Sequence, residues 1–191
     1  MEKITHIIIG CKEKNIFSQK VFYEKYYGLA LKTVFRYIYR YEKAVDVVND
    51  GFVKVFRNFE NFTKVAEEDT EKVVIGWLKK IMINTAIDEL RKNKMMPEIG
   101  GIPEYVWESS DNLFDADQLQ LYKELIILIK ELPPAYRTVF NLFVIEGYNH
   151  YEIAYLMKIP VGTSKSNLSR ARQLLQIRIK ESEQINYAEA K

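Results

Sequence analysis

At 191 residues, the chain is long enough for one domain or for two small ones. Its 48% hydrophobic and 28% charged residues are typical of a soluble globular protein and exclude a disordered or fibrous chain. The 28 Lys and Arg residues against 26 Asp and Glu residues leave a net charge of +2, so bulk charge alone does not indicate a nucleic-acid partner.

The cysteine and histidine content excludes further classes. A single cysteine, Cys11, and two histidines exclude an internal disulfide framework and a zinc site of Cys and His ligands. The apolar run from Ile7 to Ile9 is too short for a signal sequence, and no stretch approaches the roughly 18 apolar residues of a membrane span. We therefore expect a cytoplasmic protein without direct membrane insertion, metal or cofactor.

The distribution of Gly and Pro divides the chain into two helical blocks. Residues 17–94 contain three Gly and no Pro, whereas residues 97–117 collect two of each and precede a second block over residues 118–182. No segment alternates with the period of a strand. The fold class we predict is all-α, with two small helical domains joined by a flexible acidic linker and a helix-turn-helix in the C-terminal domain.

The first block contains two successive predicted helices. Apolar residues at steps of three to five predict an amphipathic helix from Phe22 to Tyr41, and a second helix follows. One arc of this second helix is a predicted core face, made by Val45, Val48, Phe52, Val55, Phe56 and Phe59. The neighbouring arc carries Asp46, Asn49, Asp50, Val53 and Arg57.

A polar loop over residues 61–73 precedes a third predicted helix, from Gly76 to Leu90. A single stripe along this helix and just beyond it carries Trp77, Lys80, Asn84, Asp88 and Arg91. A Trp beside Lys and Asn can stack on an exposed base and hydrogen-bond it. A large aromatic residue is as often part of a core, and the sequence leaves both interpretations of Trp77 open.

Charge is unevenly distributed along the chain. Residues 72–94 hold six basic and two acidic residues, residues 97–117 hold six acidic residues and no base, and residues 163–180 hold five basic residues and no acid. The two basic segments are suited to salt-dependent phosphate contacts. A solvated helix face is the alternative for either segment.

Residues 150–176 have the pattern of a helix-turn-helix. A short helix over residues 151–158 is followed by a turn over residues 159–162, and the Thr163 hydroxyl is placed to cap the next helix. The inward face of that helix holds Ser164, Leu168, Ala171 and Leu175. Its opposite face, suited to a DNA major groove, holds Lys165, Ser166, Ser169, Arg172 and Gln173. An ordinary helical hairpin is the alternative.

Together these blocks resemble the sigma-70 family of bacterial RNA polymerase sigma factors, in particular its extracytoplasmic-function (ECF) group. Residues 44–62 (AVDVVNDGFVKVFRNFENF) resemble the segment that grips the largest polymerase subunit. Residues 76–94 (GWLKKIMINTAIDELRKNK) are similar to the helix that meets the minus-ten promoter element, and residues 132–172 are similar to the minus-thirty-five reader. The resemblance implies a sigma factor that binds core RNA polymerase and directs promoter-specific transcription initiation.

The resemblance also implies a domain plan and functional residues. It places a region 2 domain at residues 1–95, a linker at 96–117, a region 4 domain at 118–183 and a tail at 184–191. The residues implied to bind core polymerase are Asp46, Asn49, Asp50, Val53 and Arg57. Those implied to bind minus-ten DNA are Trp77, Lys80, Asn84, Asp88 and Arg91. Those implied to bind minus-thirty-five DNA are Thr163, Lys165, Ser166, Asn167, Ser169, Arg170 and Arg172.

The expected partners are core RNA polymerase, promoter DNA and, by resemblance only, an anti-sigma factor. The expected mechanism uses binding energy and no bond chemistry, so the chain is not expected to be an enzyme and has no predicted catalytic residue. Four positions depart from the family, and one of them is Pro160, which stands where Ser is common. Ile83 and Asn167 stand where Arg is common, and the Asn167 amide suits adenine. Ser164 replaces a branched apolar residue, which predicts a less firmly seated recognition helix.

Other interpretations remain open on the residues alone. The face with Asp46 and Asp50 could be a solvated surface relieved by Lys54, or a nuclease-type metal pair that lacks a His or a third carboxylate. The chain could also be a helix-turn-helix regulator that acts without polymerase. A helical interaction protein with degenerate DNA-binding surfaces would explain Ile83 and Asn167.

Overall fold

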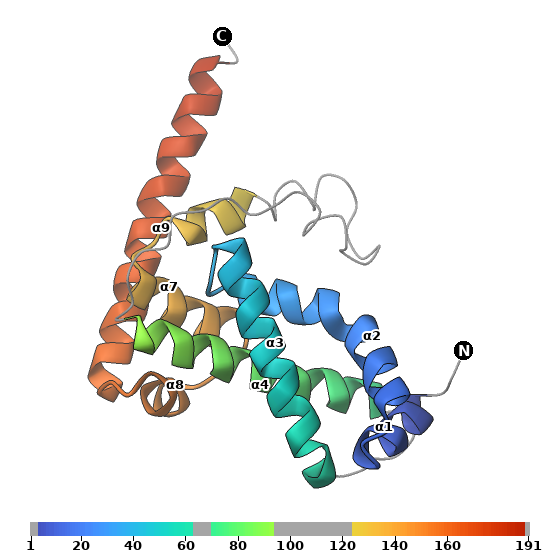
Figure 1. Ribbon diagram of the computed structural model, residues 1–191. Helices are drawn as coiled ribbons and strands as arrows, with labels where there is room; N and C mark the ends of the chain where they lie inside the picture. Colours follow the sequence, from blue (N-terminus) through green and yellow to red (C-terminus); the bar gives the residue numbers. More distant parts are fainter. Residues whose placement is uncertain (1–3, 63–69, 94–123, 190–191) are drawn as a thin grey trace. The chain divides into compact units, whose positions relative to one another are not determined.

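The structure is a computed structural model that describes residues 4–62, 70–93 and 124–189 (Figure 1). These residues are helical or lie in short connections, and none of them forms a strand, as the all-α prediction requires. The chain divides into two compact units, one centred on residues 1–90 and the other on residues 110–191. We call them the first and the second domain and describe each by itself.

The first domain consists of helices, and those of its connecting segments that the structure describes are short. Its elements are α1 (Ile4–Lys12), α2 (Ile16–Phe35), α3 (Tyr41–Asn58), the 3₁₀ turn η1 (Phe59–Asn61) and α4 (Thr70–Lys92). Helix α2 packs against both α1 and α3. The Asn15 side chain caps α2 by accepting a hydrogen bond from the Ser18 backbone N–H at 3.0 Å.

Helix α1 is an addition to the predicted elements. Its buried residues Ile7, Ile8 and Cys11 share one side, which covers α2. The signal in the sequence was their spacing of three and four residues, which is that of an amphipathic helix. A run of three apolar residues is too short for a signal sequence, but together with Cys11 it forms one face of a short helix.

Two helix boundaries differ from the prediction. Helix α2 ends at Phe35. The next apolar residues, Tyr37, Ile38 and Tyr39, are buried in the connection to α3, so their spacing results from burial and not from a helical conformation. Helix α4 begins at Thr70 and passes through Gly76, which is exposed in the helix interior.

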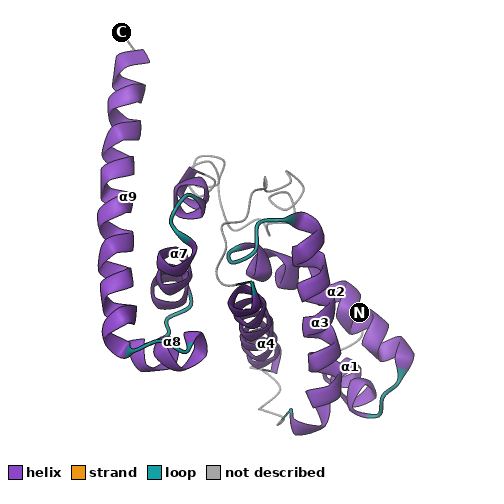
Figure 2. Cartoon of the chain, turned by 60° about the vertical axis from the view of Figure 1, so that its left-hand side comes forward, coloured by secondary structure: helices purple, strands orange, loops and turns teal. Residues whose placement is uncertain are grey.

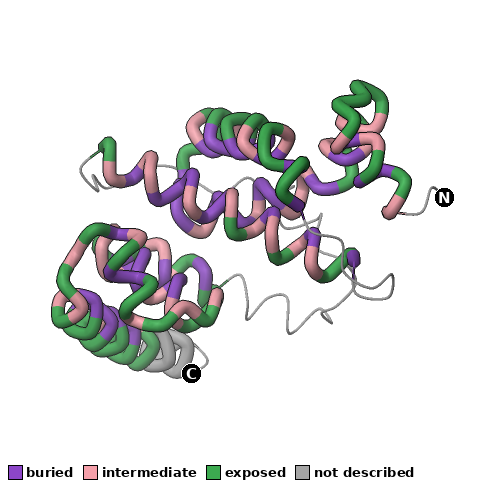
Figure 3. Tube along the Cα trace, turned by 90° about the horizontal axis from the view of Figure 1, so that it is seen from below, coloured by how far each residue is buried: buried purple, intermediate pink, exposed green. Residues whose placement is uncertain are grey.

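The core of the first domain is strongly aromatic. Phe59 is fully buried, with its ring centroid 5.0 Å from that of Phe22 and 5.1 Å from that of Trp77. Four of the six residues predicted to form the core face of α3 are buried, while Val45 and Phe56 are half-buried. Figure 3 shows such buried positions as stripes along the helices, with exposed positions between them.

In the second domain, a helical segment over residues 124–130 precedes the elements that include the helix-turn-helix. The remaining elements are α7 (Pro134–Phe140), the π-helical segment η3 (Asn141–Ile145), α8 (His150–Met157) and α9 (Val161–Glu189). Both α7 and α8 pack against α9, which extends well beyond them (Figure 2). The core includes Ile126, Ile129, Leu132, Val139, Leu142, Ile153, Leu168, Ala171 and Leu175.

The ends of α8 explain how the turn forms. Asn149 and Glu152 make a reciprocal capping box at its start, with the Asn149 N–H donating to Glu152 Oε2 at 2.8 Å. Lys158 ends the helix in the left-handed conformation, with φ of 54°. Helix α9 then begins at Val161, so Thr163 lies in its first turn and the prediction that Thr163 is the N-cap was wrong.

Helix α9 runs to Glu189 and passes the predicted end of the helical block near Ser182. Neither Gly nor Pro occurs after Gly162, so the sequence contains no strong signal that stops the helix there. Across the described residues, no helix is both long and apolar enough to span a membrane.

Candidate functional site

The outer face of α3 presents all five residues predicted to bind polymerase. Each of them is exposed, and Val53 keeps 47% of its surface accessible although it is apolar. Tyr23 on α2 donates a hydrogen bond to Asn49 Oδ1 at 3.0 Å, which orients that amide. The five residues are Asp46, Asn49, Asp50, Val53 and Arg57. A partner surface is one use for an exposed face that combines acid, amide, apolar and guanidinium groups.

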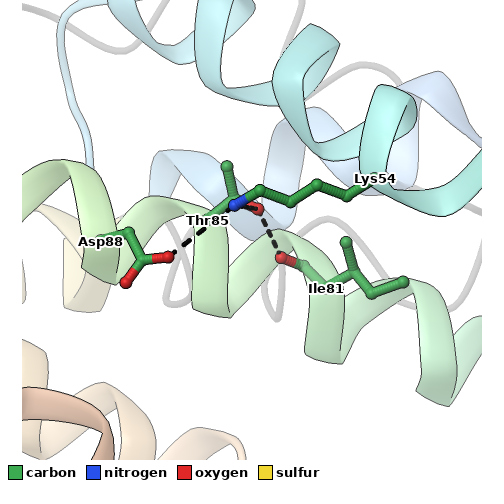
Figure 4. A network of polar contacts seen from close by, with 4 residues as sticks. All are labelled: Lys54, Ile81, Thr85 and Asp88. Carbon is green, nitrogen blue, oxygen red and sulfur yellow. Dashed lines mark hydrogen bonds and ion pairs between the residues drawn. The ribbon is translucent and has the colours of Figure 1, made fainter. Parts of the chain in front are cut away.

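Lys54 does not relieve the Asp46 and Asp50 pair in the way that the solvated-face interpretation supposed. Its Nζ points to α4, where it donates to Thr85 Oγ1 at 3.1 Å and pairs with Asp88 Oδ2 at 3.8 Å (Figure 4). Thr85 Oγ1 in turn donates to the Ile81 carbonyl at 2.8 Å. Lys54 is therefore part of the contact between α3 and α4.

A second lysine of α3 also reaches α4. Lys43 Nζ lies 2.7 Å from Glu89 Oε1, and this hydrogen bond raises the pKa of Lys43, with the field of Asp46 acting in the same direction. Both acidic residues near the end of α4 are thus paired with lysines of α3.

The predicted stripe on α4 is only partly accessible. Lys80 is exposed, whereas Asn84, Asp88 and Arg91 are half-buried. Trp77 is also half-buried, with its ring centroid 5.0 Å from that of Phe62 and in contact with Phe59. Of the two interpretations of Trp77, its packing favours the core one. Most of the loop that precedes α4, residues 63–69, lies outside the described residues.

Helix α9 has the two faces that the sequence predicts. Ser164, Leu168, Ala171 and Leu175 are buried. The exposed residues from the predicted minus-thirty-five set are Lys165, Ser166, Ser169, Arg170 and Arg172. Arg170 donates to the Tyr136 hydroxyl at 3.1 Å, which ties the exposed face to α7.

Two residues of the predicted minus-thirty-five set are less accessible. Thr163 is half-buried, and its carbonyl accepts a hydrogen bond from Ser166 Oγ at 3.1 Å. Asn167 is only 8% exposed, because its position on the helix adjoins the buried Ala171. The Asn167 amide therefore lies at the edge of the buried face and not beside Lys165.

A histidine that the sequence analysis did not single out compensates for Ser164. The Ser164 hydroxyl is fully buried and forms a hydrogen bond with His150 Nδ1 at 2.9 Å. The His150 ring stacks on Phe143 at 4.7 Å, and the Arg172 guanidinium lies 5.8 Å from the Phe143 ring centroid. Burial lowers the pKa of His150, and the charges of Lys165 and Arg172 lower it further, so the ring is neutral at pH 7.

The buried Ser164 hydroxyl therefore has a hydrogen-bond partner on α8. The signal in the sequence was a histidine at the start of the first helix of the motif, but its distance of 14 residues from Ser164 gave no reason to pair them. Within the described residues, no group of three His, Cys, Asp or Glu side chains is placed to hold a metal ion.

Two family models match the chain, one in each domain. Sigma-70 region 2 matches residues 22–95, and Sigma-70, region 4 matches residues 122–175. Helix α1 and the last part of α9 lie outside both matches.

Several curated proteins are similar over most of the chain. The ECF RNA polymerase sigma-E factor of Haemophilus influenzae is 30% identical over 70% of this chain and 73% of its own length. The ECF RNA polymerase sigma factor SigW of Bacillus subtilis is 27% identical over 84% and 86%, respectively. Among solved structures, that of CnrH in complex with the cytosolic domain of CnrY is 19% identical, covers 92% of this chain and 96% of its own, and has a TM-score of 0.46.

Proposed function

The chain belongs to the ECF group of sigma-70 RNA polymerase sigma factors, which direct transcription initiation with core RNA polymerase, and we propose which of its surfaces carry each step. This assignment rests on two exposed surfaces, one within each family match, which follow each other along the chain in the order that the family has. An exposed mixed face on α3 lies within the region 2 match, and an exposed basic face on α9 lies within the region 4 match.

The outer face of α3 binds core RNA polymerase. Asp46 and Asp50 lie four residues apart and repel each other on the isolated helix, a cost that a basic partner surface would reverse. The direction of Lys54 toward α4 supports this role, because it leaves the two carboxylates available to a partner. Val53 adds exposed apolar area that a partner would bury.

Helix α4 holds the opened strand of the minus-ten element. Lys80 and Arg91 supply positive charge for phosphates, and Asn84 supplies an amide for a base edge. Trp77 acts mainly by holding α4 on the aromatic core. The contacts must offset a few kcal/mol for each base that leaves the stack.

Helix α9 reads the minus-thirty-five element in the major groove. Lys165, Ser169 and Arg172 are all exposed on one side of the helix, which is the layout of a recognition helix. His150 and Ser164 fix this helix against α8 and thereby set the angle at which it enters the groove. The low exposure of Asn167 supports a lesser role for its amide than the sequence predicts.

The protein acts by binding and not by catalysis, and it works in the cytoplasm, where the polymerase and promoter are found. An anti-sigma factor that covers these surfaces is a further proposed partner. The predicted acidic linker at 96–117 lies outside the described residues.

Run-off transcription with purified core RNA polymerase and a candidate promoter tests the proposed function. We expect a promoter-dependent transcript and binding of the chain to core polymerase. If neither is found, the chain does not act as a sigma factor. Promoter binding in the absence of any core affinity would instead support a regulator that acts without polymerase.

Substitutions in α9 test the division of labour between the surfaces. If the side chain reads a base, Lys165→Ala or Arg172→Ala should weaken binding to minus-thirty-five duplex by about 1 to 3 kcal/mol. If it contacts a phosphate, the substitution should lower the slope of the logarithm of the binding constant against the logarithm of the salt concentration by about one. Core affinity should stay unchanged. Lys180→Ala is the matched control, because Lys180 is an exposed base on the same helix beyond the helix-turn-helix. A loss of core affinity in the Lys165 variant would contradict the assignment.

A further inference from the structure

We propose that Lys54 is a positioning residue, which neutralises Asp88 and so keeps the DNA-facing stripe of α4 attractive to a DNA strand. This inference rests on the proposed role of α4 at the minus-ten element. It assigns Asp88 to the support of that stripe and not to the groups that contact DNA.

The first step is the charge of α4 as a whole. Its three acidic residues, Glu71, Asp88 and Glu89, each form an ion pair with a lysine from a neighbouring helix. Glu71 pairs with Lys25 of α2 at 2.7 Å, and the other two pair with lysines of α3. The carboxylates of α4 are thus masked from within the domain, while its five basic residues add positive charge.

The second step is the location of the Lys54 pair. Asp88 is on the same stripe as Lys80 and Asn84, so its charge is the one that a phosphate on this stripe would meet. The side chains of Lys54 and Asp88 are each 45% exposed, which leaves the pair at the surface and within reach of a DNA strand. The pairs made by Glu71 and Glu89 lie off this stripe.

The third step is the way in which Lys54 is held. Its ammonium group donates to Thr85 Oγ1, and this hydroxyl uses its own proton for the Ile81 carbonyl. Thr85 is 5% exposed, so its oxygen is a fixed acceptor that keeps Lys54 Nζ on α4, as Figure 4 shows. An ordinary surface pair has no such anchor and is often mobile.

Replacing Lys54 with Met keeps the length of the side chain and removes the charge. This substitution removes one positive charge beside the Asp88 carboxylate, so the stripe becomes more negative and attracts DNA phosphates less. We expect holoenzyme with Lys54→Met to bind fork-junction DNA, with a single-stranded minus-ten element, about three- to tenfold more weakly than wild type. Affinity for core polymerase should not change, since Lys54 points away from the outer face of α3.

The decisive variant is Lys54→Met combined with Asp88→Asn. If the effect is electrostatic, the neutral pair restores fork binding to near the wild-type value, whereas loss of a structural link between α3 and α4 would not be rescued. Asp88→Asn alone should tighten fork binding, because it leaves Lys54 as an extra positive charge. Lys20→Met is the matched control and should have no effect, because Lys20 pairs with Glu24 within α2.

The proposal is overturned if Lys54→Met binds the fork as wild type does, or if the double variant binds as weakly as Lys54→Met alone. It is also overturned if Lys54→Met lowers core affinity by the same factor as fork affinity. Wild-type chain that binds neither core polymerase nor fork DNA would overturn the proposed function itself, which distinguishes the two failures.

Discussion

His150 connects the two helices of the helix-turn-helix at the scale of a single residue. It bonds the buried Ser164 hydroxyl, stacks on Phe143 and lies near the charges of Lys165 and Arg172. The pKa of His150 is lowered in the folded chain, so the unfolded chain takes up a proton at a higher pH. Protonation therefore favours the unfolded state.

The stabilising contribution of neutral His150 should be complete above the unfolded pKa of about 6.5 and should be lost as the pH falls below it. We expect the second domain to be less stable at about pH 5.5 than at about pH 7.5. His150→Gln, which keeps a hydrogen-bonding group for Ser164 but does not titrate, should show a smaller difference. Hydrogen exchange of the α8 and α9 amides at both pH values measures this. Equal pH dependence in the two proteins would show that His150 does not titrate in the folding transition.

At the residue scale, helical periodicity predicted which α9 positions are buried but not which polar groups pair with each other. Leu168, Ala171 and Leu175 followed from the pattern, because their spacing defines one side of a helix. The pairing of Ser164 with His150 depends on how two helices cross, which a one-dimensional pattern does not contain. The burial of Asn167 beside Ala171 fits the same periodicity, although the resemblance to the family placed this residue among those that contact DNA.

At the scale of helices, α3 and α4 approach closely at Gly51. A Cβ atom on Gly51 would overlap the Met82 sulfur and would lie 2.9 Å from Met82 Cε. Met82 is fully buried, so the end of its side chain must shift within a packed core to make room for the added carbon. This position therefore depends on glycine for packing and not for an unusual backbone conformation.

Gly51→Ala should lower the free energy of unfolding of the first domain by about 1 kcal/mol. Overpacking costs about 1 to 3 kcal/mol, and the better helix propensity of Ala returns up to about 1 kcal/mol. Gly76→Ala is the matched control, because Gly76 lies in the α4 interior with no atom within 4 Å of the added Cβ. It should stabilise by about 0.5 to 1 kcal/mol. Urea unfolding measures the change in the free energy of unfolding for both variants. A stabilising effect of Gly51→Ala would contradict the packing argument.

Helix type was more predictable than helix ends. The apolar spacing in α3 and the Gly and Pro content of the first block indicated helices correctly, because both follow from backbone geometry. The prediction that α4 begins at Gly76 was wrong, because an exposed glycine is tolerated inside a long helix that is held by its packing. The buried connection at Tyr37 to Tyr39 extended an apolar pattern beyond the end of α2.

At the scale of the whole molecule, the small net charge of +2 conceals segments of opposite sign. In the described residues, α4 and α9 carry the basic segments, and the carboxylates of α4 are paired with lysines of its own domain. The sequence could indicate the basic segments by counting, but only the fold shows which acids are neutralised. The polarity of each surface that we propose to face DNA is thus a tertiary property.

Each domain has its own buried core, which predicts that damage to one core stays local. Phe59 is fully buried among the rings of Phe22, Phe56, Phe62 and Trp77. Phe59→Ala should destabilise the first domain by about 3 to 5 kcal/mol, because it removes a large buried side chain and leaves a cavity. Core polymerase binding should fall with it.

The second domain should not respond to Phe59→Ala. We expect hydrogen exchange in α2, α3 and α4 to become faster, while amides of α7, α8 and the first half of α9 keep their wild-type protection. Binding of the variant to minus-thirty-five duplex should also stay unchanged, since α9 is held by Leu168, Ala171 and Leu175 of its own core. Leu168→Ala is the reciprocal variant and should accelerate exchange in α8 and α9 alone. If either substitution accelerates exchange in both domains, the two cores unfold as one cooperative unit, and the separation of polymerase binding from upstream DNA reading would not be a property of independent domains.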